Sequence, residues 1–417
     1  MPGQTSLYIC YFNTEEPLVH TQVLPYLRAV AGDGVRVHLL TYEKRASWRK
    51  GERRRRGVLK QALAADGICW HWLKYHRRPS LAATACDILL GILYGAWLVI
   101  RHRVNVIHGR AHVAGVIGLA LKRVLNLKLI FDLRGLMAEE YVDNGIWAEG
   151  SLPFRLVKRC ERALIRQADR LVVLTESLKA ALLNAADLAV DAKKIYVIPC
   201  CADLSRYDQA ARLAKKTDSF TLVYVGSLSG RYLLGEMMGF FKAIQRHRAG
   251  ARFLVLTRGD HAEVRRRFAA SGIDPTCYSL VNAEPGEVPA LICAADIAIS
   301  FYRQSAALLG TSPTKIGEYL AAGLPVVSTP GGDTDAILQG EEVGVIVNGL
   351  TVEDYEPAAA RLLALVERGD AAGRCRAAAR KIFSLAEVGG PRYVALYHSL
   401  HDEMSAAAEA VSVAYER

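Results

Sequence analysis

The sequence predicts an α/β fold made of two doubly wound domains. Short apolar runs of strand length alternate with longer stretches of helical period along nearly the whole chain, a pattern typical of parallel sheets with helices on both faces. The pattern occurs twice, with about six strand-like runs in each half, and a length of 417 residues suits two or three domains. We therefore expect two Rossmann-like domains that face each other across a cleft.

The expected strands fall into two groups. In the first half they are residues 7–12, 35–42, 105–108, 129–133, 171–175 and 195–199. In the second half they are residues 221–227, 252–257, 278–282, 297–301, 325–328 and 343–347. Because apolar periodicity lapses around residues 200–219, we expect an N-terminal domain of residues 1–203 and a C-terminal domain of residues 204–390. Residues from about 391 to 417 are predicted to form a helix that packs back on the N-terminal domain.

The positive charge of the chain is concentrated in its first half. The formal net charge is +11; residues 1–200 hold 30 Lys and Arg against 17 Asp and Glu, or +13, and the rest hold 23 against 25, or −2. Nine of the 17 residues in the segment 44–60 are cationic, one is acidic, and Trp48 lies among them. Basic residues contribute about 1 kcal/mol each near an anionic membrane, and Trp favours the interface. We therefore predict that this basic loop binds an anionic membrane surface.

The basic segment has two alternatives to membrane binding. A solvated loop with no partner is the main alternative. Nucleic acid is disfavoured, because neither an aromatic platform nor a groove-reading helix accompanies the basic segment. We expect no nucleic-acid binding.

Cysteine usage and local charge bear on compartment and metals. Nine cysteines, an odd number without Cys-x-x-Cys spacing, indicate reduced cytoplasmic thiols rather than disulfides or a zinc site. Asp333-Thr-Asp335 stands at a predicted helix start, which explains the two carboxylates without a metal. We expect no metal, no cofactor and no secretory signal. Residues 88–100 carry no charge, but this stretch is shorter than the roughly 20 residues that span a bilayer. We expect a buried helix there, and an interfacial helix is the alternative.

The clearest chemistry lies in Ser312-Pro-Thr-Lys-Ile-Gly-Glu-Tyr-Leu-Ala-Ala-Gly-Leu-Pro-Val-Val-Ser328. Ser312 is expected to cap a helix that ends at Gly323. Lys315 and Glu318 then share one face near the helix start. Backbone N–H groups there, together with Lys315, would hold a diphosphate, and Glu318 could accept both hydroxyls of a ribose. The alternative is a capped helix with a surface Lys–Glu pair.

This segment closely resembles the donor-binding motif of the retaining glycosyltransferases of family four, which have the GT-B fold. Four further segments resemble that family in the same order, and the resemblance extends over most of the chain. They are Phe131-Asp-Leu-Arg-Gly135 with Glu139 and Glu140, Val197-Ile-Pro-Cys-Cys-Ala-Asp203, Val225-Gly-Ser-Leu-Ser-Gly-Arg-Tyr232 and Leu291-Ile-Cys-Ala-Ala-Asp-Ile-Ala298. The first of them resembles a loop of a bacterial surface-polysaccharide branch. The resemblance implies retaining transfer of a sugar from a nucleotide diphosphate donor to a glycan or lipid-linked acceptor.

The resemblance also implies roles for individual residues. Arg231 and Lys315 would neutralise the diphosphate as it leaves, and His112, at a helix start, would face the reaction centre. The implied donor-binding residues are Gly226, Ser227, Arg231, Ser312, Lys315 and Glu318. The implied contacts to the acceptor or the transferred sugar are Asn13, His108, Arg110, Asp132, Arg134 and Arg303. A capping or core histidine is the alternative for His112, and a buried ion pair is the alternative for Asp132 and Arg134.

Two positions depart from the family pattern. Gly310 stands where the family usually has a glutamate that contacts the transferred sugar. Residues 12–17 replace a glycine-rich loop, so that Asn13 and Thr14 would have to serve there. A nucleotide-sugar epimerase of the same fold is one alternative function, and a non-catalytic membrane scaffold with a degenerate donor site is another. We expect a cytoplasmic enzyme, peripheral on the inner face of the membrane, whose partners are a nucleotide-sugar and a glycan or lipid-linked acceptor.

Overall fold

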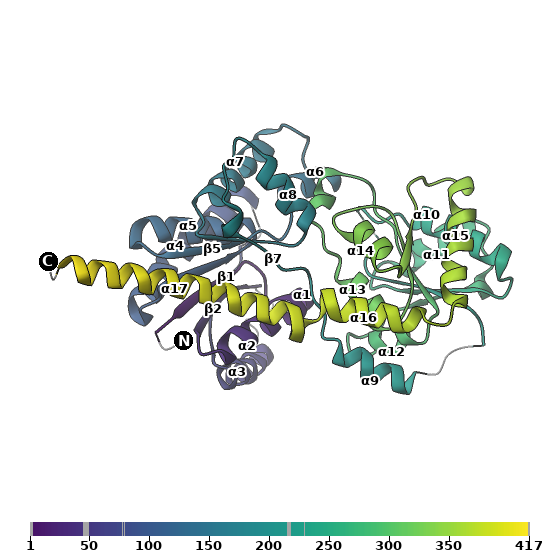
Figure 1. The fold of residues 1–417 in the computed structure, drawn as a ribbon, viewed down its shortest axis with the longest axis horizontal. Coiled ribbons are helices and arrows are strands. Elements are labelled where there is room, and N and C mark those ends of the chain that lie inside the picture. Colours follow the sequence, from purple (N-terminus) through teal and green to yellow (C-terminus); the bar gives the residue numbers. More distant parts are fainter. Residues whose placement is uncertain are drawn as a thin grey trace. The chain divides into compact units, whose positions relative to one another are not determined.

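The computed structural model describes residues 3–44, 50–76, 78, 80–214, 218–228 and 230–415. It divides into two compact units, each built on its own sheet (Figure 1). The first unit comprises Met1–Ala138, Trp147–Ile198 and Gly389–Arg417, and the second comprises Glu139–Ile146 and Pro199–Val388. The last helix therefore belongs to the first unit, and a short stretch from the first half of the chain belongs to the second.

The sheet of the first unit is parallel, and its strand order reverses in the middle. Among the described residues seven strands run in the order β3-β2-β1-β4-β5-β6-β7. The chain builds outward from β1 to β3 and then returns to the other side of β1 with β4. Right-handed crossovers place the helices that follow β1 and β2 on one face and those that follow β3 and β4 on the other. The strands are β1 Thr5–Cys10, β2 Arg36–Glu43, β3 Ile68–Lys74, β4 Val106–Arg110, β5 Lys128–Asp132, β6 Arg170–Val173 and β7 Ile195–Val197.

Helices cover both faces of this first sheet. Helix α4 packs on α5, and the last helix, α17, packs on α2. The inner strands are buried on both sides, as parallel strands in such a sheet must be, and β1 and β5 are mainly apolar. The helices are α1 Pro17–Gln22, α2 Leu24–Gly32, α3 Lys50–Ala65, α4 Ser80–His102, α5 Ala111–Leu125, α7 Leu152–Gln167, α8 Glu176–Asn184 and α17 Gly390–Tyr415. Helix α6, Met137–Asp143, crosses the division, and its residues from Glu139 onward belong to the second unit.

The second unit repeats the same topology with one strand fewer. Its described strands run in the order β10-β9-β8-β11-β12-β13, so this order reverses between β8 and β11. The strands are β8 Thr221–Val225, β9 Arg252–Leu256, β10 Tyr278–Val281, β11 Ile297–Ser300, β12 Val326–Ser328 and β13 Gly344–Ile346. The helices are α9 Ser205–Leu213, α10 Leu234–His247, α11 His261–Ala270, α12 Val288–Cys293, α13 Thr314–Ala321, α14 Thr334–Gly340, α15 Val352–Glu367 and α16 Ala371–Phe383.

The predicted fold class is confirmed, since both units are doubly wound parallel sheets with helices. Each of the six strands expected in the second half is present, and so are the six expected in the first. The prediction missed β3, an edge strand with the sequence Ile-Cys-Trp-His-Trp-Leu-Lys. Aromatic and polar side chains dominate this strand, so it lacks the aliphatic run that marked the others.

Helix α4 is not the buried helix that we expect at residues 88–100. Leu98 and Val99 are buried, but five large apolar side chains are 37–70% exposed. At 100° per residue they fall within about a third of the helix circumference, and we call them the apolar face of α4: Leu89, Leu90, Leu93, Trp97 and Ile100. The segment Leu81–His102 is long and apolar enough to cross a membrane by length and composition, and 33% of its most apolar window is buried. The expectation is wrong because only one side of α4 packs against α5 and the sheet.

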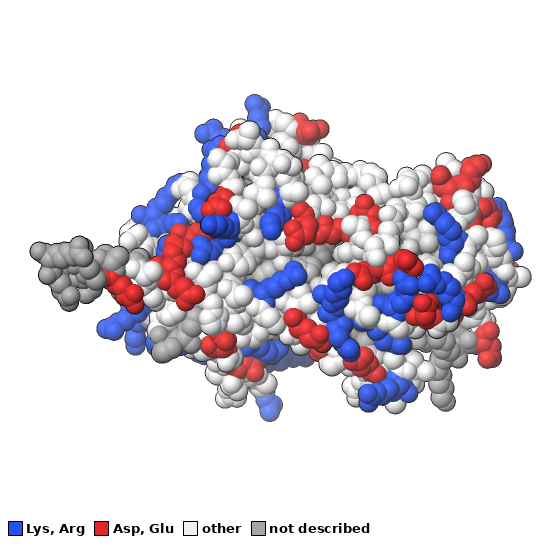
Figure 2. All heavy atoms as spheres, in the orientation of Figure 1, with Lys and Arg blue, Asp and Glu red and all other residues white. Residues whose placement is uncertain are grey.

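The predicted basic loop at residues 44–60 is largely a helix. Helix α3 begins at Lys50, as good helix formers such as Arg and Lys allow, while Trp48 and its neighbours at 45–49 lie outside the described residues. Arg54 and Arg55 are exposed, and Arg56 and Lys60 lie over the ring of Trp72 at 5.7 and 5.8 Å. Figure 2 shows Lys and Arg side chains at the lower edge of the first unit, where Figure 1 shows α3.

Candidate functional site

The strand order of the second sheet reverses between β8 and β11. Ligands of open α/β sheets bind at such a point, beyond the carboxyl ends of the strands. Gly226 directly follows β8, and its φ of +131° lies in the region that favours glycine. A Cβ atom added there would lie 2.9 Å from Nζ of Lys315. The glycine therefore lets the loop after β8 approach the lysine ammonium closely.

Lys315 lies in the first turn of α13, and its side chain is buried among three tyrosine rings. Its Nζ donates a hydrogen bond to the hydroxyl of Tyr224 at 3.2 Å. The same atom lies 4.3 Å from the ring centre of Tyr224, 4.2 Å from that of Tyr232 and 5.8 Å from that of Tyr302. These rings give the ammonium cation–π support but no full negative charge.

Burial lowers the pKa of Lys315 to about 7, although the nearby Glu318 opposes the shift; the charge of Arg231 adds to it. A pKa that burial lowers rises again when an anion comes within a few ångströms. Lys315 is thus a buried cation whose charged form a bound anion would stabilise.

Arg231, on the loop after β8, supplies a second cation. Its Nη1 donates to Oγ1 of Thr311 at 3.1 Å and lies 3.9 Å from Oε1 of Glu140. The side chain of Arg231 is 25% exposed, so the ion pair with Glu140 is weak. Both contacts use Nη1, and a guanidinium has five N–H donors. Arg231 can therefore donate to a ligand without losing either contact.

The start of α13 differs from the prediction. Ser312 does not cap the helix, because Pro313 occupies the N-cap position. The hydroxyl of Ser312 instead accepts a hydrogen bond from the backbone N–H of Cys200 at 3.2 Å. The predicted helix end is confirmed, since Gly323 follows the last turn with a φ of +84°.

Glu318 lies one turn along α13 from Lys315, and it is engaged by helix α9. Burial raises the pKa of Glu318, while the hydrogen bond from Tyr207 and the charges of Arg206 and Lys315 oppose that rise. Lys315 is only 9% exposed. The alternative of a surface Lys–Glu pair is therefore wrong.

The position that lacks the family's glutamate is apolar in this chain. Gly310 is buried at the end of a 3-10 helix, Ala306–Gly310. The carboxylates nearby come instead from α6, where Glu140 faces Arg231 and Asp143 accepts a hydrogen bond from Ser305 at 2.5 Å. Arg303 is exposed, and it meets Arg231 through its backbone N–H, which donates to the Arg231 carbonyl at 2.8 Å.

In the first unit, the predicted residues at the corresponding point between β1 and β4 form a buried network. Nη1 of Arg110 donates to Oδ2 of Asp132 at 3.2 Å, and Nη1 of Arg134 lies 3.6 Å from Oδ1 of Asp132. Arg110 is 2% exposed and Asp132 is fully buried. The ion pair that we weigh as the alternative for Asp132 and Arg134 is thus present.

The last helix, α17, completes this network. Nδ1 of His108 lies 3.0 Å from the hydroxyl of Tyr397, and the hydroxyl of Tyr393 donates to Oδ2 of Asp132 at 3.0 Å. Burial lowers the pKa of His108 to about 4, so its imidazole is neutral at pH 7. Residues far apart in the sequence therefore share one set of hydrogen bonds inside the first unit.

His112 and Asn13 also lie inside the first unit. Nε2 of His112 lies 2.8 Å from Oε2 of Glu161 on α7, and both side chains are buried. Although burial raises the pKa of Glu161, the hydrogen bond with His112 and the charge of Lys158 lower it overall. Asn13 is buried after β1 and donates to Glu15 at 3.3 Å. Glu161 fixes the orientation of the imidazole at the start of α5.

The structure groups the predicted residues by unit. Gly226, Arg231, Lys315 and Glu318 lie near one another in the second unit, and exposed Ser227 joins them through its carbonyl, which accepts from the hydroxyl of Tyr224. Sequence reasoning missed the three tyrosines around Lys315. The sequence could have indicated two of these tyrosines, because Tyr224 lies in the predicted strand β8 and Tyr302 follows the predicted strand β11. The strand order reverses between these two strands.

Two family models match the chain and together cover most of it. Residues 19–201 match a Glycosyl transferase 4-like domain, and residues 219–368 match the Glycosyl transferases group 1 domain. The chain belongs to the glycosyltransferases. Its two Rossmann-like units are those of the GT-B fold, and its activity is transfer of a sugar from a nucleotide-sugar.

Solved structures share this fold at low sequence identity. Sucrose-phosphate synthase from Thermosynechococcus elongatus aligns with a TM-score of 0.67 at 16% identity, over 97% of this chain and 100% of that one. Alr3699/HepE from Anabaena, in complex with UDP, aligns at 0.65 and 13%, over 97% and 100%. A protein described as a UDP-N-acetylglucosamine 2-epimerase from Listeria monocytogenes aligns at 0.60 and 13%, over 96% of each chain. The comparison with curated protein sequences found no match.

Proposed function

We propose that this glycosyltransferase moves a sugar, with retention of its anomeric configuration, to a glycan or lipid-linked acceptor during the synthesis of a cell-surface polysaccharide. The donor is a nucleotide diphosphate-sugar that binds the second unit, and the acceptor binds the first. No metal ion or cofactor takes part in the transfer. The observation that carries the proposal is Lys315, a buried cation beside Gly226 whose surroundings hold Arg231 as a second cation.

A diphosphate suits this arrangement better than a single carboxylate. Arg231 is close enough to Lys315 for its charge to lower the pKa of Lys315, so an anion with more than one negative charge would relieve the repulsion between the two cations. The start of α13 adds backbone N–H groups and the positive end of a helix dipole. Charge-assisted hydrogen bonds of this kind are stronger than neutral ones.

The proposed reaction needs no covalent intermediate. The acceptor hydroxyl oxygen bonds to the anomeric carbon on the side from which the diphosphate leaves. The bond between that carbon and the diphosphate oxygen breaks, its electron pair stays on the oxygen, and the acceptor proton passes to the same oxygen. Lys315 and Arg231 stabilise the negative charge that develops there, which is where such enzymes gain most of their rate.

The residues predicted on the acceptor side have two proposed roles. Some contact the acceptor or the transferred sugar, and others hold the backbone of the site in place. We propose that His112, oriented by Glu161, contacts the reaction centre, with Asn13, Arg134 and Arg303 as further contacts to acceptor or sugar. The buried residues His108, Arg110 and Asp132 act by holding the strand ends in place.

The apolar face of α4 supports a location at the cytoplasmic membrane surface. Trp97 is 52% and Ile100 is 70% exposed, and exposed Arg101 and Arg103 follow at the helix end. Helices with an apolar face and basic neighbours lie in the interface with the apolar side buried.

Because the other side of α4 packs on α5, we propose that α4 lies on the membrane rather than across it. The basic helix α3 of segment 44–60 follows β2 and lies on the opposite face of the sheet from α4. We propose that α3 reaches the same membrane at the edge strand β3, where Arg56 and Lys60 lie over Trp72.

The experiment is a transfer assay against UDP-, GDP- and dTDP-sugars with extracted lipid-linked glycans as acceptors, followed by proton NMR of the product's anomeric centre. We expect one donor class to turn over with retention. Lys315→Ala should lower turnover by about 10²–10³-fold with the fold intact, whereas exposed Lys242→Ala should not change it. Inverted product would refute retention, and full activity of Lys315→Ala would refute the donor site.

The same assay separates the epimerase alternative. An epimerase would convert the nucleotide-sugar without forming a glycan product. Both family models describe transferases, which favours transfer.

A further inference from the structure

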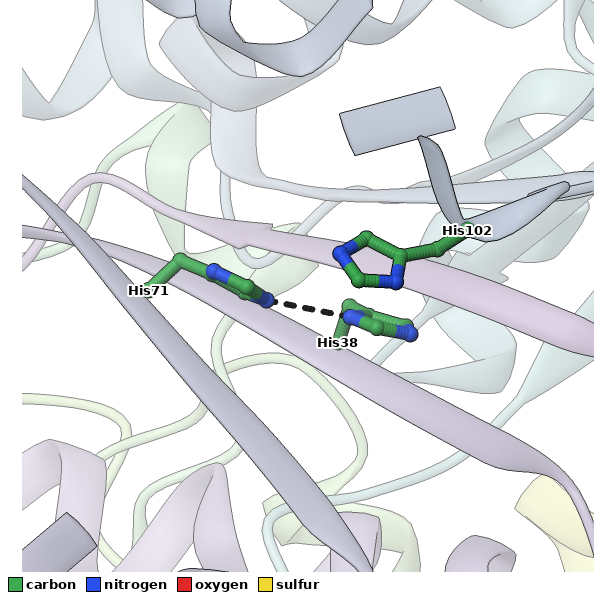
Figure 3. A group of neighbouring side chains, drawn as sticks. All are labelled: His38, His71 and His102. Atoms are coloured by element: carbon green, nitrogen blue, oxygen red, sulfur yellow. Dashed lines mark hydrogen bonds between the residues drawn. The ribbon is translucent and has the colours of Figure 1, made fainter. Parts of the chain in front are cut away.

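Three histidines from three different elements converge in the first unit (Figure 3). His38 is on β2, His71 is on the edge strand β3, and His102 is the last residue of α4. One ring nitrogen of each lies within 4.8 Å of the others. We call these three residues the His cluster. It belongs to the first unit, whereas the donor residues Lys315 and Arg231 belong to the second.

The spacing within the His cluster is close to that of a metal-bound set. Nδ1 of His38 and Nε2 of His71 are 3.0 Å apart, and tetrahedral zinc with Zn–N bonds of about 2.0–2.1 Å holds its ligand nitrogens roughly 3.3 Å apart. The ring centre of His102 lies 4.2 Å from that of His38 and 5.8 Å from that of His71. A shift of roughly 1.5 Å by the third imidazole would complete the geometry.

Packing alone does not account for the third imidazole. The hydrogen bond between His38 and His71 engages one nitrogen of each. His102 contributes only ring contacts among the described residues, to these two histidines and, at 6.3 Å, to Trp97. His38 is 5% exposed, while His71 and His102 are partly exposed, so an ion can reach the cluster from solvent.

The imidazoles are in the form that binds metals. Burial, followed by the charges of neighbouring basic and imidazole groups, lowers the pKa of His38 and of His71 to about 4. Burial and Arg101 lower the pKa of His102. Neutral imidazole presents the lone pair that a metal needs, so little proton release opposes binding at pH 7.

The donor set selects the kind of ion. Three imidazoles without a carboxylate suit Zn²⁺, Cu²⁺ or Ni²⁺ and do not suit Mg²⁺ or Ca²⁺, which take oxygen ligands. Arg36, Lys60 and Arg101 act electrostatically on the cluster. Their positive charge opposes a bare divalent ion and favours an anion as its fourth ligand.

We propose that His38, His71 and His102 form a binding site for Zn²⁺ or a similar late first-row divalent ion, with a fourth position for water or an anion. The ion would join the edge strand β3 to β2 and to the end of α4, and so stabilise the first unit. Ions that bind only the folded state raise its stability in this way. The site is independent of the proposed transfer reaction.

The test uses the full-length untagged chain, stripped with a chelator and dialysed. Zn²⁺ is titrated by calorimetry, and Co²⁺ is titrated as a spectroscopic probe of nitrogen ligands. We expect one ion per chain, visible Co²⁺ bands of a tetrahedral or five-coordinate site, and a rise in the melting temperature with Zn²⁺. His71→Ala and His102→Ala should each weaken Zn²⁺ binding by at least about 10–100-fold, since changing even the groups that orient metal ligands costs that much.

The matched control is His20→Ala, an exposed histidine in the same unit, which should bind Zn²⁺ as the unaltered chain does. Circular dichroism confirms that each variant is folded. His71 and His102 are chosen because their side chains are partly exposed, whereas His38 is buried. Absence of Zn²⁺ binding to the unaltered chain, unchanged binding by His102→Ala, or equal loss in His20→Ala would overturn the proposal.

Discussion

The two units use a buried cation at the carboxyl ends of their strands in opposite ways. In the first unit, Arg110 meets Asp132 at 3.2 Å, and Tyr393 of α17 binds the same carboxylate. In the second unit, Lys315 is surrounded by tyrosine rings and Gly226, and its pKa falls to about 7. A cation in direct contact with a buried carboxylate holds the scaffold together, whereas a cation whose direct contacts are tyrosine rings is prepared for an anionic ligand. This difference supports the proposed diphosphate site in the second unit.

The largest expected effect concerns the buried ion pair between Arg110 and Asp132 in the first unit. Arg110→Ala leaves the buried carboxylate of Asp132 without its nearest cation, and such a change should lower the free energy of unfolding by about 3–5 kcal/mol. Urea denaturation followed by circular dichroism measures it. A double change of Arg110→Met with Asp132→Leu should recover most of the loss, because it removes both buried charges. Unaltered stability of Arg110→Ala would mean that the pair is not structural.

The next effect tests the close approach in the second unit. In Gly226→Ala the new Cβ would lie 2.9 Å from Nζ of Lys315 at a φ of +131°, and displacement of the lysine should lower turnover by roughly 10–100-fold, as strain of about 1–3 kcal/mol implies. Gly272→Ala is the matched control, since Gly272 has a φ of +72° with nothing near its Cβ position. Equal losses of turnover in both variants would assign the effect to backbone strain rather than to Lys315.

The pH dependence of donor binding should follow Lys315. Burial holds its pKa at about 7 in the free protein, and the diphosphate requires the protonated form, so binding above pH 7 takes up a proton. Affinity for the nucleotide-sugar should be nearly constant below pH 7 and then fall by up to about tenfold per pH unit. Calorimetry from pH 6 to about pH 9 measures this, and Lys315→Arg, which stays charged, should flatten the profile. A flat profile in the unaltered chain would contradict the assignment.

The smallest expected effect concerns the surface of the first unit. Changing Leu93 and Ile100 on the apolar face of α4 to Ser should reduce sedimentation with anionic vesicles by several-fold, because about 25 cal/mol of favourable transfer is lost per Å² of apolar surface. Val124→Ser is the control, since Val124 is 78% exposed on α5 and lies outside that face. Unchanged sedimentation of the variant with Ser at positions 93 and 100 would refute the proposed membrane contact.

The sequence predicted the fold well where strands are aliphatic and poorly where they are not. The strands of the second half follow directly from their apolar runs, but β3 alternates rings with polar groups and escapes that signal. Missing β3 also hid the His cluster, whose members His38 and His71 are 33 positions apart and show no ligand spacing. A side chain's neighbours across such distances depend on tertiary structure, which periodicity does not report.

The candidate site shows the same limit. Gly226 is recognisable from one short segment, and Lys315 and Glu318 are recognisable from another, because the residues of each segment are neighbours in the sequence. The end of α13 at Gly323 follows from the preference of glycine for the position after a helix. The cap at Ser312 fails because Pro313 takes the N-cap position. The tyrosines around Lys315, and Tyr393 of α17, which donates to Asp132, come from distant parts of the chain. Sequence reasoning therefore found the charged groups but not the environment that tunes them.

The pKa of the Lys315 side chain tests most directly whether the donor diphosphate contacts this residue. It is measured by NMR of the protein labelled with ¹³C at the lysine ε carbon. Lys315→Arg assigns the signal by its disappearance. In the free protein, the pKa should lie near 7, and saturation with the nucleotide-sugar that turns over should raise it by more than about two units, since an adjacent anion favours the ammonium form. A Lys315 pKa that stays near 7 in the presence of bound donor would contradict its contact with the diphosphate.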